Sequence, residues 1–284
     1  MPAMSRRAVL ELVWAGIWYA ILCFLAVVLA LPLFWLVTTS LKTGGQTFLM
    51  PPKWIPDPFV WSNYSDAFQA VAFHEYFWNT IRIVFFATTG ALLTASLAAF
   101  AFARLRFPLR GTLFILVLST IMLPSIVTLI PTFIVFRTLG WIDTFLPLIV
   151  PLWFGGGAFN IFLFRQFFMT IPLELDEAAR IDGASNLRIY WGIILPLSKP
   201  VIATIAVFAF IHNWNDFFEP LIYLQSPENW TMAIGLRGFR DLYSTQWNLM
   251  MAASTAMIMP LLVLFFLAQR YFVSGIQMSG LTGR

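Results

Sequence analysis

Five polar side chains between residues 212 and 223 could hydrogen-bond to, or exchange protons with, a bound molecule. They recur at steps of three and four residues, the spacing that places side chains on one face of an α-helix. The members of this polar stripe are His212, Asn215, Asp216, Glu219 and Tyr223. Carboxylates, amides and aromatic faces suit hydroxyl-rich solutes such as sugars, so the stripe is a candidate wall of a solute path. The same groups could instead hydrogen-bond a neighbouring helix or a partner subunit.

The stripe lies in an apolar stretch long enough to cross a membrane. Apart from Asp216 and Glu219, residues 200–224 contain no Asp, Glu, Lys or Arg. Ionisable groups inside a span are costly and normally face a bundle interior or a water-filled cavity. A proton relay of Asp216, Glu219 and His212, as in a proton-coupled secondary transporter, is a rival interpretation. Such transporters often show inverted repeats and broken helices, and the sequence shows neither clearly.

Catalysis by the chain itself finds little support in its residues. The glycine run 155–157 is not a phosphate-binding loop, because no Gly-Lys-Ser/Thr follows it. The two histidines, His74 and His212, are far apart in the sequence, and no metal-ligand cluster or Ser/His/Asp arrangement can be argued. We therefore expect no cofactor, no metal and no ATP hydrolysis by this chain, and a membrane-embedded enzyme is the least supported class.

A second polar region is the segment Pro172–Pro200, here called the polar island. Because so many charges cannot lie in hydrocarbon, the island is expected to face water between two spans. Its pattern predicts two short helices joined by Gly183, which suits a left-handed helix C-cap. Ser185 or Asn186 would cap the second helix. Six charged residues of the island fall within a run of fifteen positions, and they are Glu174, Asp176, Glu177, Arg180, Asp182 and Arg188.

The island contains three short motifs at fixed spacing, which are Glu177-Ala178-Ala179, Asp182-Gly183-Ala184 and Ile194-Leu195-Pro196. Together they resemble the EAA loop of the membrane subunits of binding-protein-dependent ABC importers. The segments 164–168, 214–216 and 269–275 are similar to the carbohydrate, maltose-transporter-type branch of that family. The resemblance extends from Asn79 to the C-terminus. A surface hairpin without a partner is the rival interpretation of the island.

The resemblance implies an all-α, polytopic membrane protein with six transmembrane helices and the type I ABC importer permease fold. It also implies that the island couples the permease to a separate ATPase. The residues implied in that coupling are Glu177, Ala178, Ala179, Asp182, Gly183, Ala184, Leu195 and Pro196. The implied partners are a second, distinct permease subunit, an ABC ATPase dimer, an extracytoplasmic solute-binding protein and a sugar or oligosaccharide. In the maltose-type family one loop reaches into the binding protein, and the matching residues here are Arg237, Gly238, Phe239 and Arg240.

The composition is that of a polytopic membrane protein. Of the 284 residues, 60% are hydrophobic and 11% are charged, against about 25% charged residues in soluble domains. We expect one transmembrane domain over residues 1–284, with outer loops at 42–79 and 225–248 and a coupling loop at 167–199. The six expected spans cover residues 12–38, 80–103, 111–136, 144–166, 200–224 and 249–270.

The distribution of Lys and Arg predicts how the spans are oriented. With the N-terminus inside, eleven of these residues lie on the inner side and six on the outer side, which obeys the positive-inside rule. Both termini and the polar island would then be cytoplasmic, in a bacterial plasma (inner) membrane. The apolar run 12–41 is too long and bulky for a cleaved signal peptide. The net charge of +4 fits cytoplasmic loops and predicts no nucleic-acid binding.

Overall fold

The computed structural model describes residues 6–240 and 246–280, and these residues form helices joined by turns and loops. The expected all-α class is confirmed. Residues 241–245, part of the expected outer loop 225–248, lie outside the described residues, as do both ends of the chain. The α-helices are α1 (Arg6–Ser40), α2 (Ser62–Ala70), α3 (Phe73–Arg104), α4 (Arg110–Ser119), α5 (Ser125–Thr138), α6 (Leu146–Ile149), α7 (Ala158–Thr170), α8 (Glu174–Ile181), α9 (Asn186–Ile189), α10 (Leu195–Leu197), α11 (Lys199–Asn215), α12 (Phe218–Tyr223), α13 (Met232–Gly235) and α14 (Trp247–Gly280).

Several described helices are long and apolar enough to cross a membrane. Two further helix pairs reach that length only together, and they are bent by 99° and 79°. Among the described residues, four stretches could therefore cross a membrane by length and composition, or up to six if each bent pair is one span. The four long stretches are Leu10–Ser40, Phe73–Arg104, Leu146–Thr170 and Trp247–Gln269, and the bent pairs are Arg110–Met122 with Ser125–Thr138 and Asn186–Leu197 with Lys199–Asn215.

Three of the expected spans are not single helices. The expected span 144–166 consists of α6, a 3-10 turn and α7, and it is interrupted at residues 154–157, where three glycines have positive φ. Prolines explain the breaks in the other two. The expected span 111–136 is divided at Pro124 into α4 and α5, because proline has no N–H to continue the helix. In the expected span 200–224, the ring of Pro220 would collide with the carbonyl of Asp216 if the helix were continuous. Asp216 instead has an extended backbone, with φ −64° and ψ 121°, between α11 and α12. The continuous helical face expected for the polar stripe is therefore wrong.

The chain divides into two compact units, which are described separately. The first contains α1, α2 and the beginning of α14, and side chains 10–34 of α1 are exposed, as expected of a lipid-facing helix. Its polar centre is Asn63, whose Nδ2 donates to the carbonyls of Ser40 and Lys42, both at 2.8 Å. The Oδ1 of Asn63 accepts a hydrogen bond from Asn248 at 3.0 Å. One buried amide thus joins three segments of this unit.

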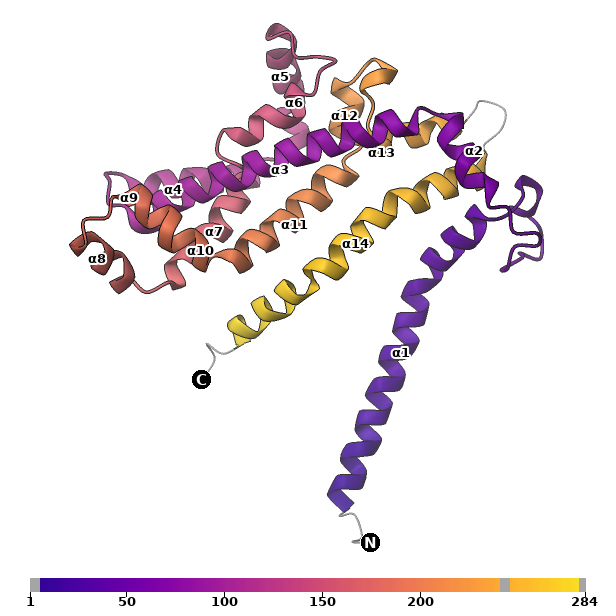
Figure 1. The fold of residues 1–284 in the computed structure, drawn as a ribbon, viewed down its shortest axis with the longest axis horizontal. Coiled ribbons are helices and arrows are strands. Elements are labelled where there is room, and N and C mark those ends of the chain that lie inside the picture. Colours follow the sequence, from indigo (N-terminus) through magenta and orange to yellow (C-terminus); the bar gives the residue numbers. More distant parts are fainter. Residues whose placement is uncertain (1–5, 241–245, 281–284) are drawn as a thin grey trace. The chain divides into compact units, whose positions relative to one another are not determined.

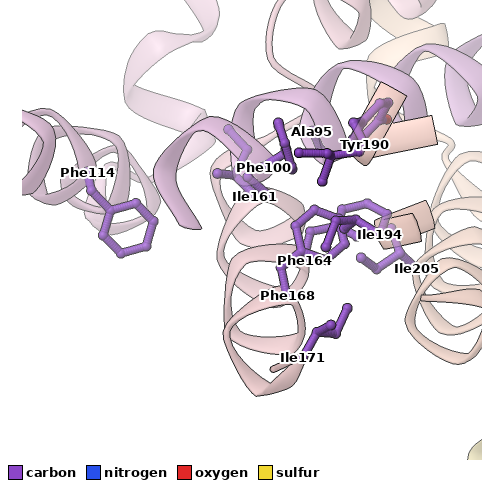
Figure 2. Packing of buried hydrophobic residues seen from close by; sticks show 12 residues of the cluster. Ala95, Phe100, Phe114, Ile161, Phe164, Phe168, Ile171, Tyr190, Ile194 and Ile205 are labelled. Carbon is purple, nitrogen blue, oxygen red and sulfur yellow. The ribbon is translucent and has the colours of Figure 1, made fainter. Parts of the chain in front are cut away.

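The second unit is organised around α3, which packs against α7 and α11 (Figure 1). Its core is formed by apolar side chains of these helices and of the π-helical turn Tyr190–Ile194 (Figure 2). A close approach of α3 is possible at Gly156, where φ is +64° and a Cβ atom would collide with the carbonyl of Ala91. The main core residues are Ala95, Phe100, Ile161, Phe164, Phe168, Tyr190, Ile194 and Ile205.

The two ends of α3 meet different parts of the second unit. Helices α8 and α9 lie at its C-terminal end, and α12 and α13 lie near its N-terminal end (Figure 1). Near the latter end, the side chain of Asn79 donates to the carbonyl of Trp230 at 3.1 Å, and the Thr80 hydroxyl accepts from the amide of Met232 at 3.0 Å. Roughly 36 Å of helix separates Thr80 from Arg104, at 1.5 Å per residue. One helix therefore connects both regions that the sequence singles out.

Candidate functional site

The polar island folds into the two short helices that its sequence predicts. Helix α8 ends at Ile181, and Gly183, which follows the C-cap Asp182, has the expected left-handed conformation with φ +78°. The amide of Gly183 donates to the carbonyl of Arg180 at 3.0 Å, and the amide of Ala184 donates to that of Ala179 at 2.8 Å. These two bonds form a Schellman motif, which satisfies carbonyls left open at a helix end. Helices α8 and α9 with their turn, residues 174–189, are called the hairpin below.

The second helix of the hairpin starts with the predicted cap. The Ser185 hydroxyl accepts from the amide of Arg188 at 3.3 Å, so Ser185 is the N-cap and Asn186 is the first helical residue. The chain continues through the π-helical turn into α10, which contains Leu195 and Pro196. The helical path does not stop at Pro196 but ends two residues later, at Ser198.

The outer surface of the hairpin is accessible and partly apolar. Ala179 and Ala184 are half-buried against the core, so the paired alanines of the motif face different ways and only Ala178 is exposed. Ile181 is 87% exposed and Leu187 is also exposed, although the motif did not point to either. Exposed apolar side chains beside charged ones are typical of a protein-binding surface. The other predicted coupling residues are exposed at Glu177, Asp182, Gly183 and Pro196 and half-buried at Leu195.

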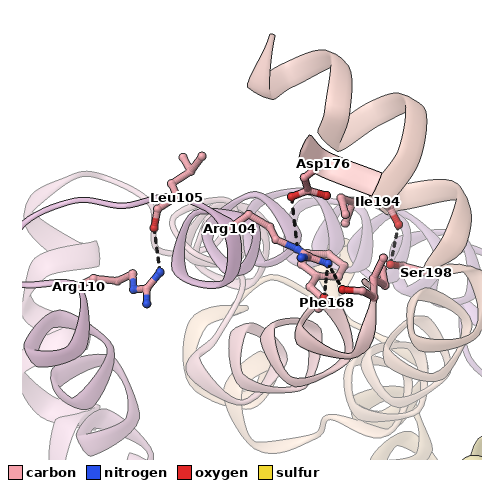
Figure 3. Close-up of polar contacts among 8 residues, drawn as sticks. Arg104, Leu105, Arg110, Phe168, Asp176, Ile194 and Ser198 are labelled. Atoms are coloured by element: carbon pink, nitrogen blue, oxygen red, sulfur yellow. Dashed lines mark hydrogen bonds and ion pairs between the residues drawn. The ribbon is translucent and has the colours of Figure 1, made fainter. Parts of the chain in front are cut away.

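A buried arginine connects the end of α3 to the hairpin (Figure 3). The Nη2 of Arg104 donates to the carbonyls of Phe168 and Ile171, both at 2.7 Å. Its Nε lies 3.7 Å from Oδ2 of Asp176, in the first turn of α8, and both side chains are almost fully buried. Neither carboxylate oxygen of Asp176 accepts a hydrogen bond from the described residues. The sequence predicted that Asp176 faces water with the other charges of the polar island, and this prediction is wrong because Asp176 is buried against Arg104.

A second polar contact joins α3 to the part of the island that follows the hairpin. The Tyr190 hydroxyl lies 2.7 Å from the Ser96 hydroxyl, and both residues are buried. The Tyr190 ring also packs 5.4 Å from the ring of Phe100, measured between centroids. The hairpin and the π-helical turn that follows it are therefore both in contact with α3.

At the other end of the second unit lies a cavity of about 230 Å³. It is bounded by α3, α5, α6, α11, α12 and the segment before α13. Four stripe residues border it, although α11 and α12 are separate helices. The fifth, Asn215, does not border it and donates to the carbonyl of Ile211 at 2.9 Å. The polar residues of the lining are Thr80, Thr132, His212, Asn213, Asp216, Glu219, Tyr223 and Thr231.

The stripe residues at the cavity have distinct local roles. Asp216 begins α12, because its Oδ1 accepts from the amides of Phe218 at 3.1 Å and Glu219 at 3.3 Å. Tyr223 is buried and stacks on Phe133, with ring centroids 6.4 Å apart. Glu219 and His212 are exposed and form no ion pair among the described residues. The cavity thus combines one structural carboxylate with one accessible carboxylate.

Thr231 is a polar residue of the cavity that sequence reasoning missed. It is 4% exposed, and its hydroxyl has no hydrogen-bond partner among the described residues. A buried hydroxyl normally has such a partner, because burying it alone is unfavourable. No sequence signal distinguishes Thr231 from the threonines around it, since its position depends on the contact of the next residue with Thr80.

Asp143 holds one wall of this region in place. Its amide donates to the carbonyl of Tyr223 at 2.8 Å, and its carboxylate accepts from the amides of Gln225 at 2.9 Å and Ser226 at 2.8 Å. The Ser226 side chain donates to the same carboxylate. The hydrogen bonds from Ser226, and then those from Asn229 and Gln225, lower the pKa of Asp143 to about 2. Asp143 has no local signal in the sequence, because its hydrogen-bond partners lie some eighty residues away.

The residues implied in contact with a binding protein are not equally accessible. Arg237 and Gly238 are exposed in the second unit, and Arg240 is exposed in the first. Phe239 is buried and therefore offers no free surface. Within residues 6–240 and 246–280, no group of three or more His, Cys, Asp or Glu side chains is placed to hold a metal ion.

Comparison with known proteins identifies the class. Residues 91–278 match the family described as binding-protein-dependent transport system inner membrane component. The chain is 37% identical over 253 residues to the sn-glycerol-3-phosphate transport system permease protein UgpE of Yersinia enterocolitica, covering 86% of this chain and 89% of the relative. It is 36% identical over 259 residues to UgpE of Brucella abortus, covering 88% and 91%.

Solved structures share the fold. A chain from the crystal structure of a bacterial ABC transporter that imports the acidic polysaccharide alginate matches with a TM-score of 0.82 and 24% identity, over 96% of this chain and 100% of that one. A chain of the inward-facing MetNI methionine ABC transporter matches with a TM-score of 0.53 and 16% identity, over 70% and 93%.

This chain belongs to the family of binding-protein-dependent transport system inner membrane components. It is a permease subunit of an ABC importer with the type I fold, and the resemblance found in the sequence is confirmed. Membership implies a membrane location with several spans, and an ATPase and a solute-binding protein as partners. The rival interpretation as a proton-coupled secondary transporter is not favoured.

Proposed function

We propose that this chain is one of two different permease subunits in a sugar importer, paired with an ATPase dimer. The hairpin docks on one ATPase subunit, and ATP-driven closure of the ATPases moves it. The chain has no catalytic site of its own and contributes half of the translocation path. The accessible apolar side chains of the hairpin, Ile181 and Leu187, support this docking. ATP can bias the permease only if the ATP-bound ATPase favours one of its conformations.

The proposed orientation places the hairpin and both termini in the cytoplasm. It rests on the excess of Lys and Arg on that side. The test uses single cysteines at Asn186 in the hairpin and at Glu228 beyond α12, both exposed, with native Cys23 replaced. In sealed right-side-out vesicles, an impermeant thiol reagent should label only the Glu228 variant. The opposite labelling would remove the hairpin from the ATPase and overturn the proposal.

We further propose that the cavity is part of the solute path. The observation that carries this is Thr231, whose buried hydroxyl borders the cavity and has no hydrogen-bond partner in the part of the chain that the structure describes. The exposed carboxylate of Glu219 adds a second hydrogen-bonding group. An exposed carboxylate inside a span is costly unless it meets water, solute or another subunit.

The solute at this cavity should be hydroxyl-rich and without net negative charge. The lining holds two carboxylates, hydroxyls, an amide and aromatic rings, and it contains no Lys or Arg. Two relatives are named for sn-glycerol-3-phosphate, and one structural neighbour imports an acidic polysaccharide. An anion would meet the repulsion of Asp216 and Glu219 here without a compensating cation. A different solute from those proteins is therefore the proposal for this chain.

The experiment measures ATP hydrolysis by the purified complex with its binding protein in nanodiscs. Maltose, glycerol and sn-glycerol-3-phosphate serve as probes of neutral and anionic solutes. We expect one of the neutral probes to stimulate hydrolysis, and we expect Thr231→Val to raise the concentration needed while Thr231→Ser preserves it. Stimulation by sn-glycerol-3-phosphate alone would contradict the proposed solute class. Identical responses of the Val and Ser variants would remove Thr231 from the path.

A further inference from the structure

In the buried contact between α3 and the hairpin, Arg104 donates hydrogen bonds to α7 but only forms an ion pair with α8. Two donated hydrogen bonds of 2.7 Å fasten the Arg104 guanidinium to carbonyls at the end of α7. Those carbonyls are among the groups that a helix C-terminus leaves open. The contact to Asp176 is 3.7 Å long, whereas charge-assisted N–H···O bonds are usually 2.7–2.9 Å. Arg104 is therefore fixed to α7 and holds α8 through charge.

Asp176 depends on this charge for its burial. It is 1% exposed, and no other basic side chain within residues 6–240 and 246–280 forms an ion pair with it. A buried carboxylate without a countercharge is strongly unfavourable. The position of α8 on the transmembrane helices thus depends on Arg104, although the distance between the two charged groups is longer than that of a hydrogen bond.

The part of the island that follows the hairpin is attached to the same helix. Tyr190 and Ser96 join their hydroxyl groups at 2.7 Å, two helical turns before Arg104. At its opposite end, α3 borders the cavity through Thr80 and Ile83. A rigid helix is therefore held by the hairpin at one end and forms a wall of the cavity at the other.

We propose that Arg104 and Asp176 form the mechanical link by which movement of the hairpin reaches α3 and, through it, the cavity. Both are positioning residues, and neither touches solute or ATP. When the docked hairpin moves, α8 pulls on the end of α3 through this pair, with α7 following because Arg104 also binds its carbonyls. This link rests on the proposed function, since it requires a hairpin that is moved by an ATPase.

The test separates folding from coupling by replacing the pair in two ways. Arg104→Met/Asp176→Leu removes both charges, and apolar replacement of a complete buried ion pair usually preserves stability. Asp176→Asn keeps the shape and removes the attraction. It leaves the Arg104 cation without a countercharge, but the guanidinium keeps its two hydrogen bonds to the carbonyls of Phe168 and Ile171. Arg110→Met is the matched control, because Arg110 donates to the carbonyl of Leu105 at 3.0 Å at the same end of the unit without touching the hairpin (Figure 3).

The readouts are the yield of assembled complex and the number of solute molecules imported per ATP hydrolysed in proteoliposomes. We expect the double variant and Asp176→Asn to assemble and to import about tenfold fewer solute molecules per ATP, within the 5–150-fold range of typical couplings. Arg110→Met should keep the wild-type ratio. A wild-type ratio in the assembled double variant would overturn the link, and so would loss of assembly in both variants, because the pair would then act only in folding. ATP-independent uptake by the wild type would instead contradict the proposed function.

Discussion

The charged side chains near the two ends of α3 differ in burial and in pairing. At the hairpin end, Arg104 and Asp176 are buried and neutralise each other. At the cavity end, Glu219 and His212 are exposed and form no ion pair among the described residues. Buried paired charges connect elements of one protein, whereas accessible unpaired charges remain available to a ligand. The difference assigns coupling to one end of the second unit and solute contact to the other.

The largest effect is expected from a substitution that breaks the buried ion pair at the hairpin end of α3. Arg104→Met leaves the carboxylate of Asp176 buried without a countercharge, which should destabilise the protein by roughly 3–5 kcal/mol. Thermal unfolding of the detergent-solubilised chain measures this loss. Arg110→Met is the control, because its partly buried side chain has no acidic partner among the described residues. Equal unfolding temperatures for the two variants would show that the buried ion pair contributes no more to stability than the hydrogen bond of Arg110.

A smaller effect is expected at the hairpin turn. Gly183→Val places a β-branched residue at φ +78°, which costs about 1–2 kcal/mol. No heavy atom beyond the two adjacent residues lies within 4 Å of the added Cβ, so the expected cost comes from the backbone conformation. We expect the variant to insert in the membrane and to retain less ATPase during purification. Gly183→Asn should be milder, since Asn tolerates this conformation, and equal ATPase retention in both variants would argue against the turn's role in docking.

At the cavity end, the two roles of Asp216 can be separated. Asp216→Asn keeps an acceptor for the amides of Phe218 and Glu219, whereas Asp216→Leu loses the cap at a cost of about 1 kcal/mol. For a neutral solute we expect partial ATP-driven uptake in the Asn variant and none in the Leu variant. A proton relay would make the Asn variant fail in accumulation while still exchanging solute. Normal complex yield with normal uptake in Asp216→Leu would contradict any role of this residue.

The smallest expected effect concerns Asp143, whose side chain is partly exposed and therefore screened. Its pKa of about 2 lies below the ordinary value of 3.8. The stabilisation is therefore complete above pH 4 and is lost as the pH falls towards 2. Asp143→Asn tolerates the positive φ of this position, so it isolates the charge. The difference in unfolding temperature between wild type and variant should shrink between pH 5 and 3, and a constant difference would contradict this account.

Local patterns were sufficient for much of the fold and for the family. The charge run of the polar island, the left-handed Gly183 and the Ser185 cap each depend on neighbouring residues only, and the structure contains all three. The prediction of one continuous helical face for the polar stripe was wrong, because the helical spacing was counted through Pro220. That proline could have been taken into account from the sequence. Pro220 also explains why four stripe residues reach one cavity from two separate helices.

The missing parts of the site depend on contacts between distant segments. Arg104 and Asp176 are each ordinary in sequence, and only the packing of α7 beside α3 brings them together. Thr231 borders the cavity because the next residue binds Thr80 on α3. Such pairings cannot be derived from spacing along the chain, because the two partners belong to different elements.

The most direct test of the account is solute imported per ATP hydrolysed, measured over a range of solute concentrations in the assembled complex. The account predicts that Thr231→Val raises the half-saturating solute concentration and leaves the limiting ratio near that of wild type. It predicts that Asp176→Asn lowers the limiting ratio about tenfold and leaves the half-saturating concentration near that of wild type. If both variants changed the same quantity, the division of the permease into a solute-contacting end and a coupling end would be contradicted.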